Sequence, residues 1–341
     1  MVTRVNEYGS RIRAEGFKLI PLTLRRRGRN PWQEFRVIAQ LVRIYRTERP
    51  DIVHHVAIKP VLYGSVAASL THVRATVNAL AGLGYVFSSS QRKARMLRPL
   101  VKLAYHFLLN RANSRTIIQN PEDRHLLTTA AFLSPEKTVL IRGSGVDVSF
   151  FAPAPEPHDI PVIVMACRML WDKGAREFVQ AARLVHEAGI SARFVLVGKS
   201  DTENPMAVPV SQLAEWQQQG DVEWWGHRED MHRVFALSHI ACLPTFYGEG
   251  LPKVLIEAAA CGRPIVATDV PGCREIVRHG ENGLLVPARD PGALAEALKQ
   301  LILDPALRQR MGRRGREIAE AEFSEARVAH ETLAVYRSLL A

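Results

Sequence analysis

The sequence predicts an α/β protein with two doubly wound, Rossmann-like domains facing a cleft, and three observations support this. Short apolar runs alternate with segments of helical period along the 341 residues, which is typical of parallel sheets covered by helices. The segment Phe151–Pro161 carries four prolines in eleven residues and is the best candidate for a linker. The balance of charge changes at the same place.

The expected strands are short apolar runs bounded by turn-forming residues. In the first half they are Phe17–Pro21, Ile52–Val56, Ala75–Asn78, Thr116–Gln119 and Thr138–Ile141. In the second half they are Val162–Cys167, Arg193–Val197, Val222–Trp224, Ile240–Leu243, Pro264–Ala267 and Gly283–Val286. The clearest helical periodicity lies between them, at Trp32–Glu48, Ala175–Ala188, Pro252–Ala260 and Ala293–Leu303.

Composition excludes several classes of protein. With 47% hydrophobic and 23% charged residues, the chain is neither disordered nor collagen-like. No apolar run is long enough to span a membrane, and the first residues lack the apolar core of a signal peptide. The four cysteines form no CxxC pair and have no histidine cluster beside them, so we expect small buried side chains in a reducing cytoplasm.

The net charge of +11 is unevenly distributed. Residues 1–150 hold 24 Lys and Arg against 9 Asp and Glu, giving +15, whereas residues 151–341 hold 21 against 25, giving −4. One basic cluster is Arg25–Arg29, and another opens an amphipathic segment at 92–109. Such a helix can lie on an anionic membrane, and it is also consistent with an ordinary solvated face. No aromatic-interleaved or zinc-finger pattern supports nucleic-acid binding.

The segment Leu243–Pro264 bears the most chemistry. A strand ends near its start, a glycine-containing loop follows, and Pro252 suits the first turn of a helix. Backbone amides around Gly250 would then point ahead of the helix and form an anion site. Glu249 and Glu257 bracket this site, about 12 Å apart along a helix, which suits a nucleotide-diphosphate sugar with its ribose at Glu257. A helix with an acidic first turn is the alternative.

Two cations follow the strand Val162–Cys167. Arg168 and Lys173 lie in a strand-to-helix loop at the carboxyl end of a parallel strand, where ligands bind in open α/β sheets. Such side chains can hold phosphate oxygens and stabilise the charge that develops on a departing diphosphate. They are also consistent with exposed loop charges.

These motifs resemble the retaining glycosyltransferases of family 4, which have the GT-B fold. The resemblance spans about residues 1 to 337. It rests on Glu249-x7-Glu257 and on these segments: Ala260–Thr268, Pro271–Glu275, Asn282–Pro287, the phosphate loop Arg168–Gly174 and the base loop Val222–Asp230. It implies a donor domain at 153–324 and an acceptor domain at 1–152, to which a final helix at 325–341 crosses back.

The resemblance also implies residue roles. Arg168 and Lys173 would hold the diphosphate, and Glu249 would lie near the transferred sugar. The remaining donor contacts would come from Gly226, His227, Arg228, the helix start Gly250, Leu251 and Pro252, and Glu257 on ribose. No metal or other cofactor is expected, because these cations and the helix end replace it, and no Asp-x-Asp motif is present. Retention by same-face attack needs no dedicated nucleophile.

The segments Pro50–Ser65 and Asn78–Phe87 resemble the bacterial PglA-like group, which extends undecaprenyl-diphosphate-linked sugars from UDP donors. The acceptor-side candidates are His54, His55, Lys59, Asn78, Gly82 and Gly84. The histidines are equally consistent with a structural role, and the glycines with a turn. The resemblance favours a cytoplasmic enzyme held on the inner face of the cell membrane by helix 92–109, with a UDP-sugar and a polyprenyl-diphosphate-linked acceptor as partners and no nucleic acid.

The first domain departs from the family pattern. Met1–Arg4 looks like its second strand, Glu7–Ala14 the next helix and Phe17–Pro21 the third strand, so the first strand-helix unit is absent. In the usual strand order that strand is central, and its loss leaves unpaired backbone. A misplaced start codon is the favoured explanation, and a chain impaired in folding or catalysis is the other. The functional alternatives are a catalytically silent nucleotide-sugar-binding subunit and the same chemistry on a soluble acceptor.

Overall fold

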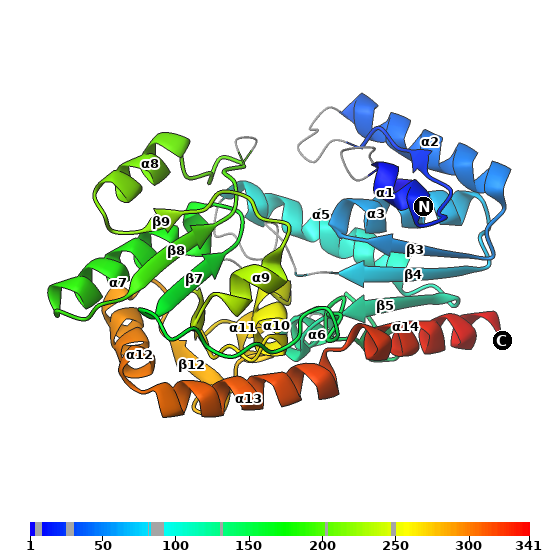
Figure 1. The fold of residues 1–341 in the computed structure, drawn as a ribbon. Coiled ribbons are helices and arrows are strands. Elements are labelled where there is room, and N and C mark those ends of the chain that lie inside the picture. Colours follow the sequence, from blue (N-terminus) through cyan, green and yellow to red (C-terminus); the bar gives the residue numbers. More distant parts are fainter. Residues whose placement is uncertain are drawn as a thin grey trace.

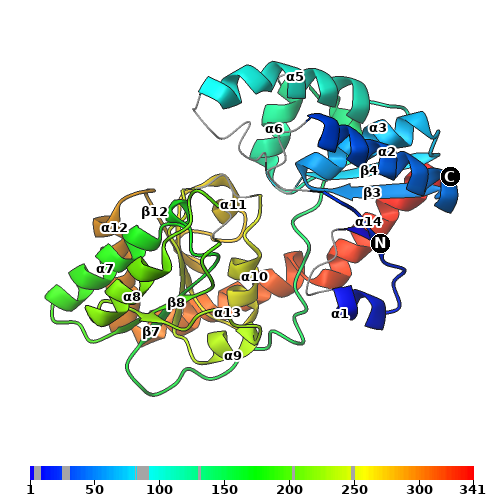
Figure 2. The ribbon, with the colours of Figure 1, turned by 90° about the horizontal axis from the view of Figure 1, so that it is seen from above.

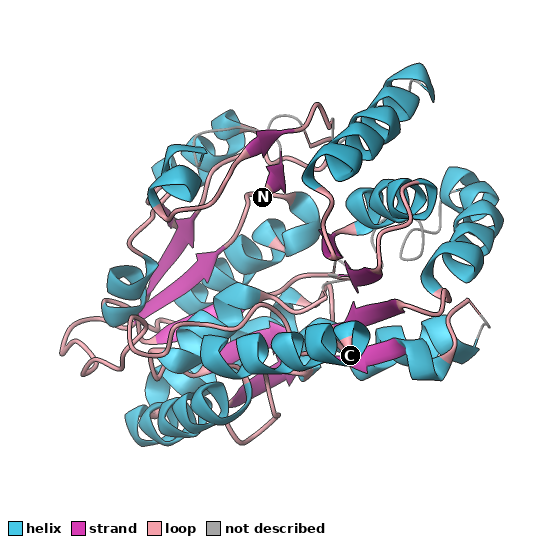
Figure 3. Ribbon diagram, turned by 90° about the vertical axis from the view of Figure 1, so that its right-hand side faces the viewer, coloured by secondary structure: helices cyan, strands magenta, loops and turns pink. Residues whose placement is uncertain are grey.

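The computed structural model confirms the α/β class and places its two largest parallel sheets in separate halves of the molecule (Figure 1). It describes residues 1–3, 9–24, 31–80, 82, 92–129, 132–201, 204–246 and 250–341, with residues 31 and 92–98 described as backbone only. The basic cluster Arg25–Arg29 lies outside the described residues. Figure 3 shows helices packed around the strands of both halves.

The first half contains β1 (Val2–Thr3), α1 (Gly9–Ala14), β2 (Ile20–Pro21), α2 (Pro31–Glu48), β3 (Ile52–Val56), α3 (Ile58–Leu70), β4 (Ala75–Leu80), α5 (Arg92–Leu109), β5 (Ser114–Ile118), α6 (Pro121–Thr129) and β6 (Thr138–Leu140). The second half contains β7 (Val162–Ala166), α7 (Ala175–Glu187), β8 (Arg193–Val197), α8 (Val210–Gln218), β9 (Glu223–Trp224), α9 (Met231–Ala236), β10 (Ile240–Leu243), α10 (Lys253–Ala260), β11 (Ile265–Thr268), α11 (Pro271–Arg274), β12 (Gly283–Val286), α12 (Pro291–Leu303) and α13 (Pro305–Glu322). The last helix is α14 (Glu325–Leu340).

The sheet of the second half has the order β12-β11-β10-β7-β8-β9, and every neighbouring pair is parallel. All residues of β7 and β10 are buried, as expected for parallel strands covered by helices on both faces. The chain moves outward from β7 to β9 and then returns to β10 on the other side of β7. This reversal is a topological switch point, where the loops after β7 and β10 leave toward opposite faces and ligands bind between them.

The sheet of the first half is divided in two. β3, β4, β5 and β6 form one parallel sheet, whereas β1 pairs with β2, Val2 lying opposite Ile20. A cavity of about 820 Å³ lies between the two parts and is lined by Val2 and Thr3 on one side and residues 52–56 on the other. Among the described residues, the strands of this half therefore form two separate parallel sheets.

The end of the chain connects the two halves. Helix α13 packs in the second half, and α14 continues along the first, as Figure 2 shows from above. Val328 and Val335 of α14 pack in a buried cluster with Val77 and Ile117 of the first sheet. Among the described residues, no helix combines the length and the apolar character needed to cross a membrane.

Candidate functional site

The loop after β7 is held against the loop after β8. The Cys167 and Met169 amides donate to the backbone oxygens of Val197 and Lys199, at 3.0 and 3.1 Å. Arg168 lies between these two amides, and its guanidinium donates to the Asp201 carboxylate at 2.9 Å. The Arg168 side chain stays half exposed, at 52% of its full accessibility. Arg168 is therefore anchored at the edge of the switch point, with part of its charge balanced by Asp201.

The same loop contacts the loop after β10. The Asp172 backbone oxygen accepts from the Phe246 amide at 3.0 Å and from the Thr245 hydroxyl at 3.2 Å. Gly174 has φ of 85°, and a β-carbon there would lie 2.1 Å from the Pro244 oxygen. Only glycine allows this approach. The two loops of the switch point are thus packed together, and a role of the β7 loop in phosphate binding stays a prediction.

Lys173 lies within this contact and is largely removed from water. Burial lowers the pKa of Lys173, Cys167 opposes that shift, and the nearby Arg168 charge lowers the pKa further. Burial likewise raises the pKa of Asp172, while Lys173 and Arg168 oppose that rise. In such a poorly solvated setting a cation interacts strongly with an anionic ligand, because little solvent screens it.

The helix α10 begins at Lys253, one residue after the expected start, with Pro252 at the N-cap position. Glu257 follows one turn later and is partly buried. Burial raises the pKa of Glu257 to about 7, and Lys253 opposes the rise. The other predicted carboxylate, Glu249, lies outside the described residues. A raised pKa means that the charge of Glu257 is sensitive to a ligand near neutral pH.

The predicted base loop lies on the other side of the β7 loop. Gly226 adopts φ of 66°, and its oxygen accepts from the Gly198 amide at 2.7 Å. His227 is exposed. Arg228 forms a two-point ion pair with Asp230, at 2.7 and 2.6 Å, which raises the pKa of Arg228. The backbone of this loop therefore contacts the loop after β8, whereas the Arg228 guanidinium is paired with Asp230.

The acceptor-side candidates fall into two environments. His55 and Asn78 lie in the core, where the His55 Nδ1–H donates to Asn78 Oδ1 at 2.8 Å and Nε2 accepts from the Tyr45 hydroxyl at 2.9 Å. Burial lowers the pKa of His55 to about 4, so the ring is neutral. His54 and Lys59 are nearer the surface.

At the surface, His54 Nδ1 lies 2.6 Å from the Tyr336 hydroxyl of α14. The Lys59 ammonium pairs with Glu34 at 2.8 Å. Gly82 has φ of 86°, which a turn requires, and Gly84 lies outside the described residues. Contact of any of these residues with an acceptor stays a prediction.

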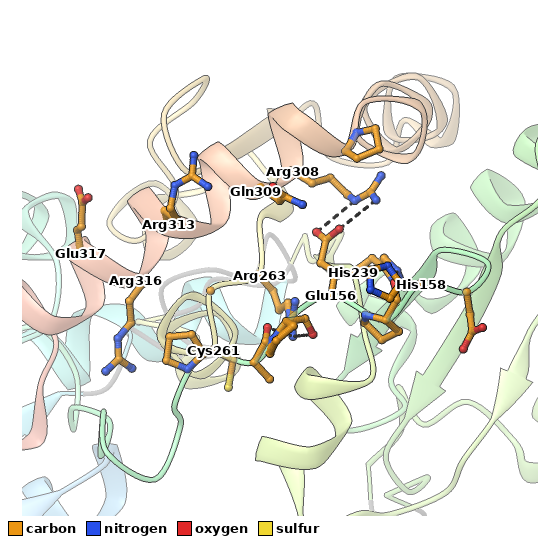
Figure 4. Close-up of a pocket in the computed structure, with 17 residues that line it drawn as sticks. Glu156, His158, His239, Cys261, Arg263, Arg308, Gln309, Arg313, Arg316 and Glu317 are labelled. Atoms are coloured by element: carbon orange, nitrogen blue, oxygen red, sulfur yellow. Dashed lines mark hydrogen bonds and ion pairs between the residues drawn. The ribbon is translucent and has the colours of Figure 1, made fainter.

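A cavity of about 700 Å³ lies away from the switch point (Figure 4). It is lined by the linker residues 153–159, the start of α13 and the carboxyl end of α10, opposite the end where Gly250 lies. Arg308 pairs there with Glu156 at 3.1 Å, and Arg263 donates to the oxygens of Phe235 and Ala154 at 2.8 Å. These arginines hold the linker in place, so we do not place the donor here.

Sequence reasoning missed two residues beside the candidate site. Asp201 pairs with Arg168, and nothing in the local pattern identifies it as a partner. Asn120 donates to the Gly250 oxygen at 3.1 Å from the first half of the molecule. The run Asn120–Asp123 after an apolar strand is a helix-start signal. That signal predicts a helix cap at Asn120, but it does not predict a contact with Gly250, which lies 130 residues further along the chain.

Comparisons with known proteins match both halves. A family model described as "Glycosyl transferase 4-like" matches residues 1–120, and one described as "Glycosyl transferases group 1" matches residues 160–304. An N,N'-diacetylbacillosaminyl-diphospho-undecaprenol alpha-1,3-N-acetylgalactosaminyltransferase of Campylobacter jejuni is 26% identical, over 97% of this chain and 88% of that protein. A UDP-Gal:alpha-D-GlcNAc-diphosphoundecaprenol alpha-1,3-galactosyltransferase of Escherichia coli is 25% identical, over 81% and 72%.

Solved structures share the architecture. HepE of Anabaena in complex with UDP-glucose superposes with a TM-score of 0.80 at 17% identity, covering 98% of this chain and 89% of that one. A glycosyltransferase from Rickettsia africae superposes with a TM-score of 0.79 at 18% identity, covering 99% of this chain and 89% of that one. At these identities the likeness establishes the fold alone.

Proposed function

Because the chain belongs to glycosyltransferase family 4 and has the GT-B fold, we propose that it moves a hexose or an N-acetylhexosamine from a UDP-sugar to a lipid-diphosphate-linked saccharide, with retention. One observation carries the proposal. The loops after β7 and β10 are joined by hydrogen bonds from Thr245 and Phe246 to the Asp172 backbone oxygen, and Lys173, the next residue along the chain, is poorly solvated. A poorly solvated cation and the start of α10 would together suit a diphosphate.

The donor would lie across the carboxyl ends of β7, β8 and β10. Its base would contact the backbone at 226–228, and Glu257 would accept hydrogen bonds from the ribose hydroxyls. Lys173, Arg168 and the amides of Gly250 and Leu251 would hold the diphosphate. Arg168 shares part of its charge with Asp201, and its side chain is half exposed to water.

In the proposed reaction, the bond between the sugar anomeric carbon and the diphosphate oxygen breaks, and the acceptor hydroxyl oxygen bonds to that carbon from the same face. The acceptor proton passes to the departing UDP, so no protein nucleophile is needed. Negative charge accumulates on the diphosphate as the bond breaks. Lys173 and the helix start therefore bind the transition state more tightly than the donor, which is what accelerates the step.

The lipid-linked acceptor is supported by two observations. The relatives from Campylobacter jejuni and Escherichia coli are named for diphospho-undecaprenol acceptors. Helix α5 exposes Leu100, Leu103 and Phe107 at 65, 57 and 67%, and their spacing places them along one side of the helix. Basic residues open the same helix. This pattern suits attachment to an anionic membrane surface, where the acceptor is held.

The transfer is tested by measuring UDP release from a panel of UDP-hexoses and UDP-N-acetylhexosamines. The acceptors are an undecaprenyl-diphosphate-linked saccharide and the same saccharide without its lipid diphosphate. We expect UDP release that depends on the lipid-linked acceptor. Binding of UDP-sugar without turnover would favour the silent binding subunit. Equal turnover with the free saccharide would favour a soluble acceptor.

The membrane contact is tested by sedimentation with phosphatidylglycerol-containing vesicles. Phe107→Glu should reduce binding several-fold, because it places a charge in the apolar face of α5. Leu303→Glu on α12 is the matched control, since Leu303 is 66% exposed on the other half of the molecule. Equal loss of binding in both variants would contradict a role for α5.

A further inference from the structure

We propose that Asn120 is a positioning residue. Through it, the first domain orients the backbone amides of the second domain that would bind the phosphates. The proposal rests on the proposed function, because it takes the amides of Gly250 and Leu251 as donor contacts. It adds a residue from the opposite domain to that site. Its basis is a buried hydrogen bond between the domains, from Asn120 Nδ2 to the Gly250 oxygen at 3.1 Å.

The orientation of the Asn120 side chain is fixed by its own domain. Asn120 is fully buried between β5 and α6. Its Oδ1 accepts from the Asp123 amide at 2.7 Å, and its Nδ2 donates to Asp123 Oδ2 at 3.0 Å. The amide of Asp123 requires an acceptor, so the oxygen of Asn120 faces the helix and the nitrogen is left to face Gly250. The side chain is thus a rigid donor held by the first turn of α6.

A hydrogen bond to the Gly250 oxygen sets the direction of the neighbouring amide. The Gly250 carbonyl and the Leu251 N–H belong to one planar, trans peptide unit, and in such a unit they point in opposite directions. When Asn120 holds the carbonyl, the Leu251 N–H is turned away from the first domain. The Leu251 N–H is a predicted hydrogen-bond donor to the phosphates. Its orientation therefore depends on the Asn120 side chain, which holds the carbonyl of the same peptide unit.

Two further contacts between the domains surround this hydrogen bond. A β-carbon on Gly143, just after β6, would lie 2.7 Å from a terminal methyl carbon of Leu251. Glu122, two residues after Asn120, pairs with Arg274 of α11 at 2.7 Å. Figure 1 draws α6 next to α11, in agreement with this ion pair. Separation of the domains would remove all three contacts. The direction of the Leu251 N–H therefore depends on contact between the domains.

A capping role and a positioning role can be separated by substitution. Asn120→Ser keeps a side-chain oxygen for the Asp123 amide but is too short to reach Gly250, whereas Asn120→Ala loses both interactions. For positioning, kcat/KM for the UDP-sugar should fall roughly five- to hundredfold in both variants, since a buried carbonyl loses its partner. The thermal midpoint should fall less in the Ser variant than in the Ala variant.

Asn110 supplies the matched control. Its side chain also accepts from a backbone amide, that of Ser134, and donates to backbone oxygens of His106 and Phe132, but these partners all lie in the first domain. Asn110→Ser should leave kcat/KM for the donor unchanged. If Asn120→Ser keeps the donor kinetics of the unmodified chain, Asn120 is only a cap and the proposal is overturned. If the unmodified chain itself neither turns over nor binds UDP-sugar, the proposed function fails and the positioning role fails with it.

Discussion

Replacement of Lys173 by methionine tests the proposed chemistry most directly. Methionine keeps an unbranched side chain of similar length and removes the charge together with the N–H donors of the ammonium group. Lys173 is largely buried and its pKa is lowered by that burial, so a diphosphate beside it is poorly screened by water. Two unit charges about 4 Å apart interact by roughly 4 kcal/mol at an effective dielectric of about 20.

Two neighbours reduce that figure. Arg168 remains to hold part of the developing charge, and Asp172 already balances part of the Lys173 charge. We therefore expect a loss of about 2–4 kcal/mol of transition-state stabilisation, or roughly 30- to 1,000-fold in kcat. The thermal midpoint should change little, because the relief from desolvating the Lys173 charge offsets the lost attraction between Lys173 and Asp172.

The assay is UDP release at saturating donor and acceptor, paired with thermal unfolding of the same preparations. Lys299→Met on α12 serves as the control, because Lys299 belongs to a pair with Glu296 within one helix and lies outside the proposed donor site. A folded Lys173→Met enzyme with kcat within threefold of the unmodified enzyme would show that this cation does not act on the leaving group.

Three other predictions follow from the same geometry. Arg168→Gln should lower kcat less than Lys173→Met, roughly three- to 30-fold in the same assay, because water screens the half-exposed Arg168 side chain. Affinity for the UDP-sugar should weaken about tenfold from pH 8 to pH 6, because Glu257, with its pKa raised to about 7, loses its charge as the pH falls through that value. Calorimetry with Glu257→Gln should show no such trend. Gly174→Ala should destabilise the fold by about 2–4 kcal/mol in urea unfolding, since its β-carbon would meet a backbone oxygen at 2.1 Å. Gly189→Ala, with a similar φ and open space, should lose only about 1 kcal/mol.

The sequence by itself determined the class of fold and indicated the segments in which we propose that the chemistry takes place. Strands such as Ile240–Leu243 and helices such as 92–109 were predicted closely, because periodicity and turn residues are local properties that the chain carries with it. The loop Arg168–Gly174 could be identified for the same reason, since a cation directly after an apolar strand lies at the strand's carboxyl end in any parallel sheet.

Only the tertiary structure decided which groups meet. That Asp201 balances Arg168, that Asn120 holds the Gly250 oxygen, and that both nitrogens of His55 have partners in the core depend on residues far apart in the chain. The charge states follow from the same source. Lys173 and Glu257 have shifted pKa values because the folded chain removes water from around them, and no pattern of neighbouring residues encodes that removal.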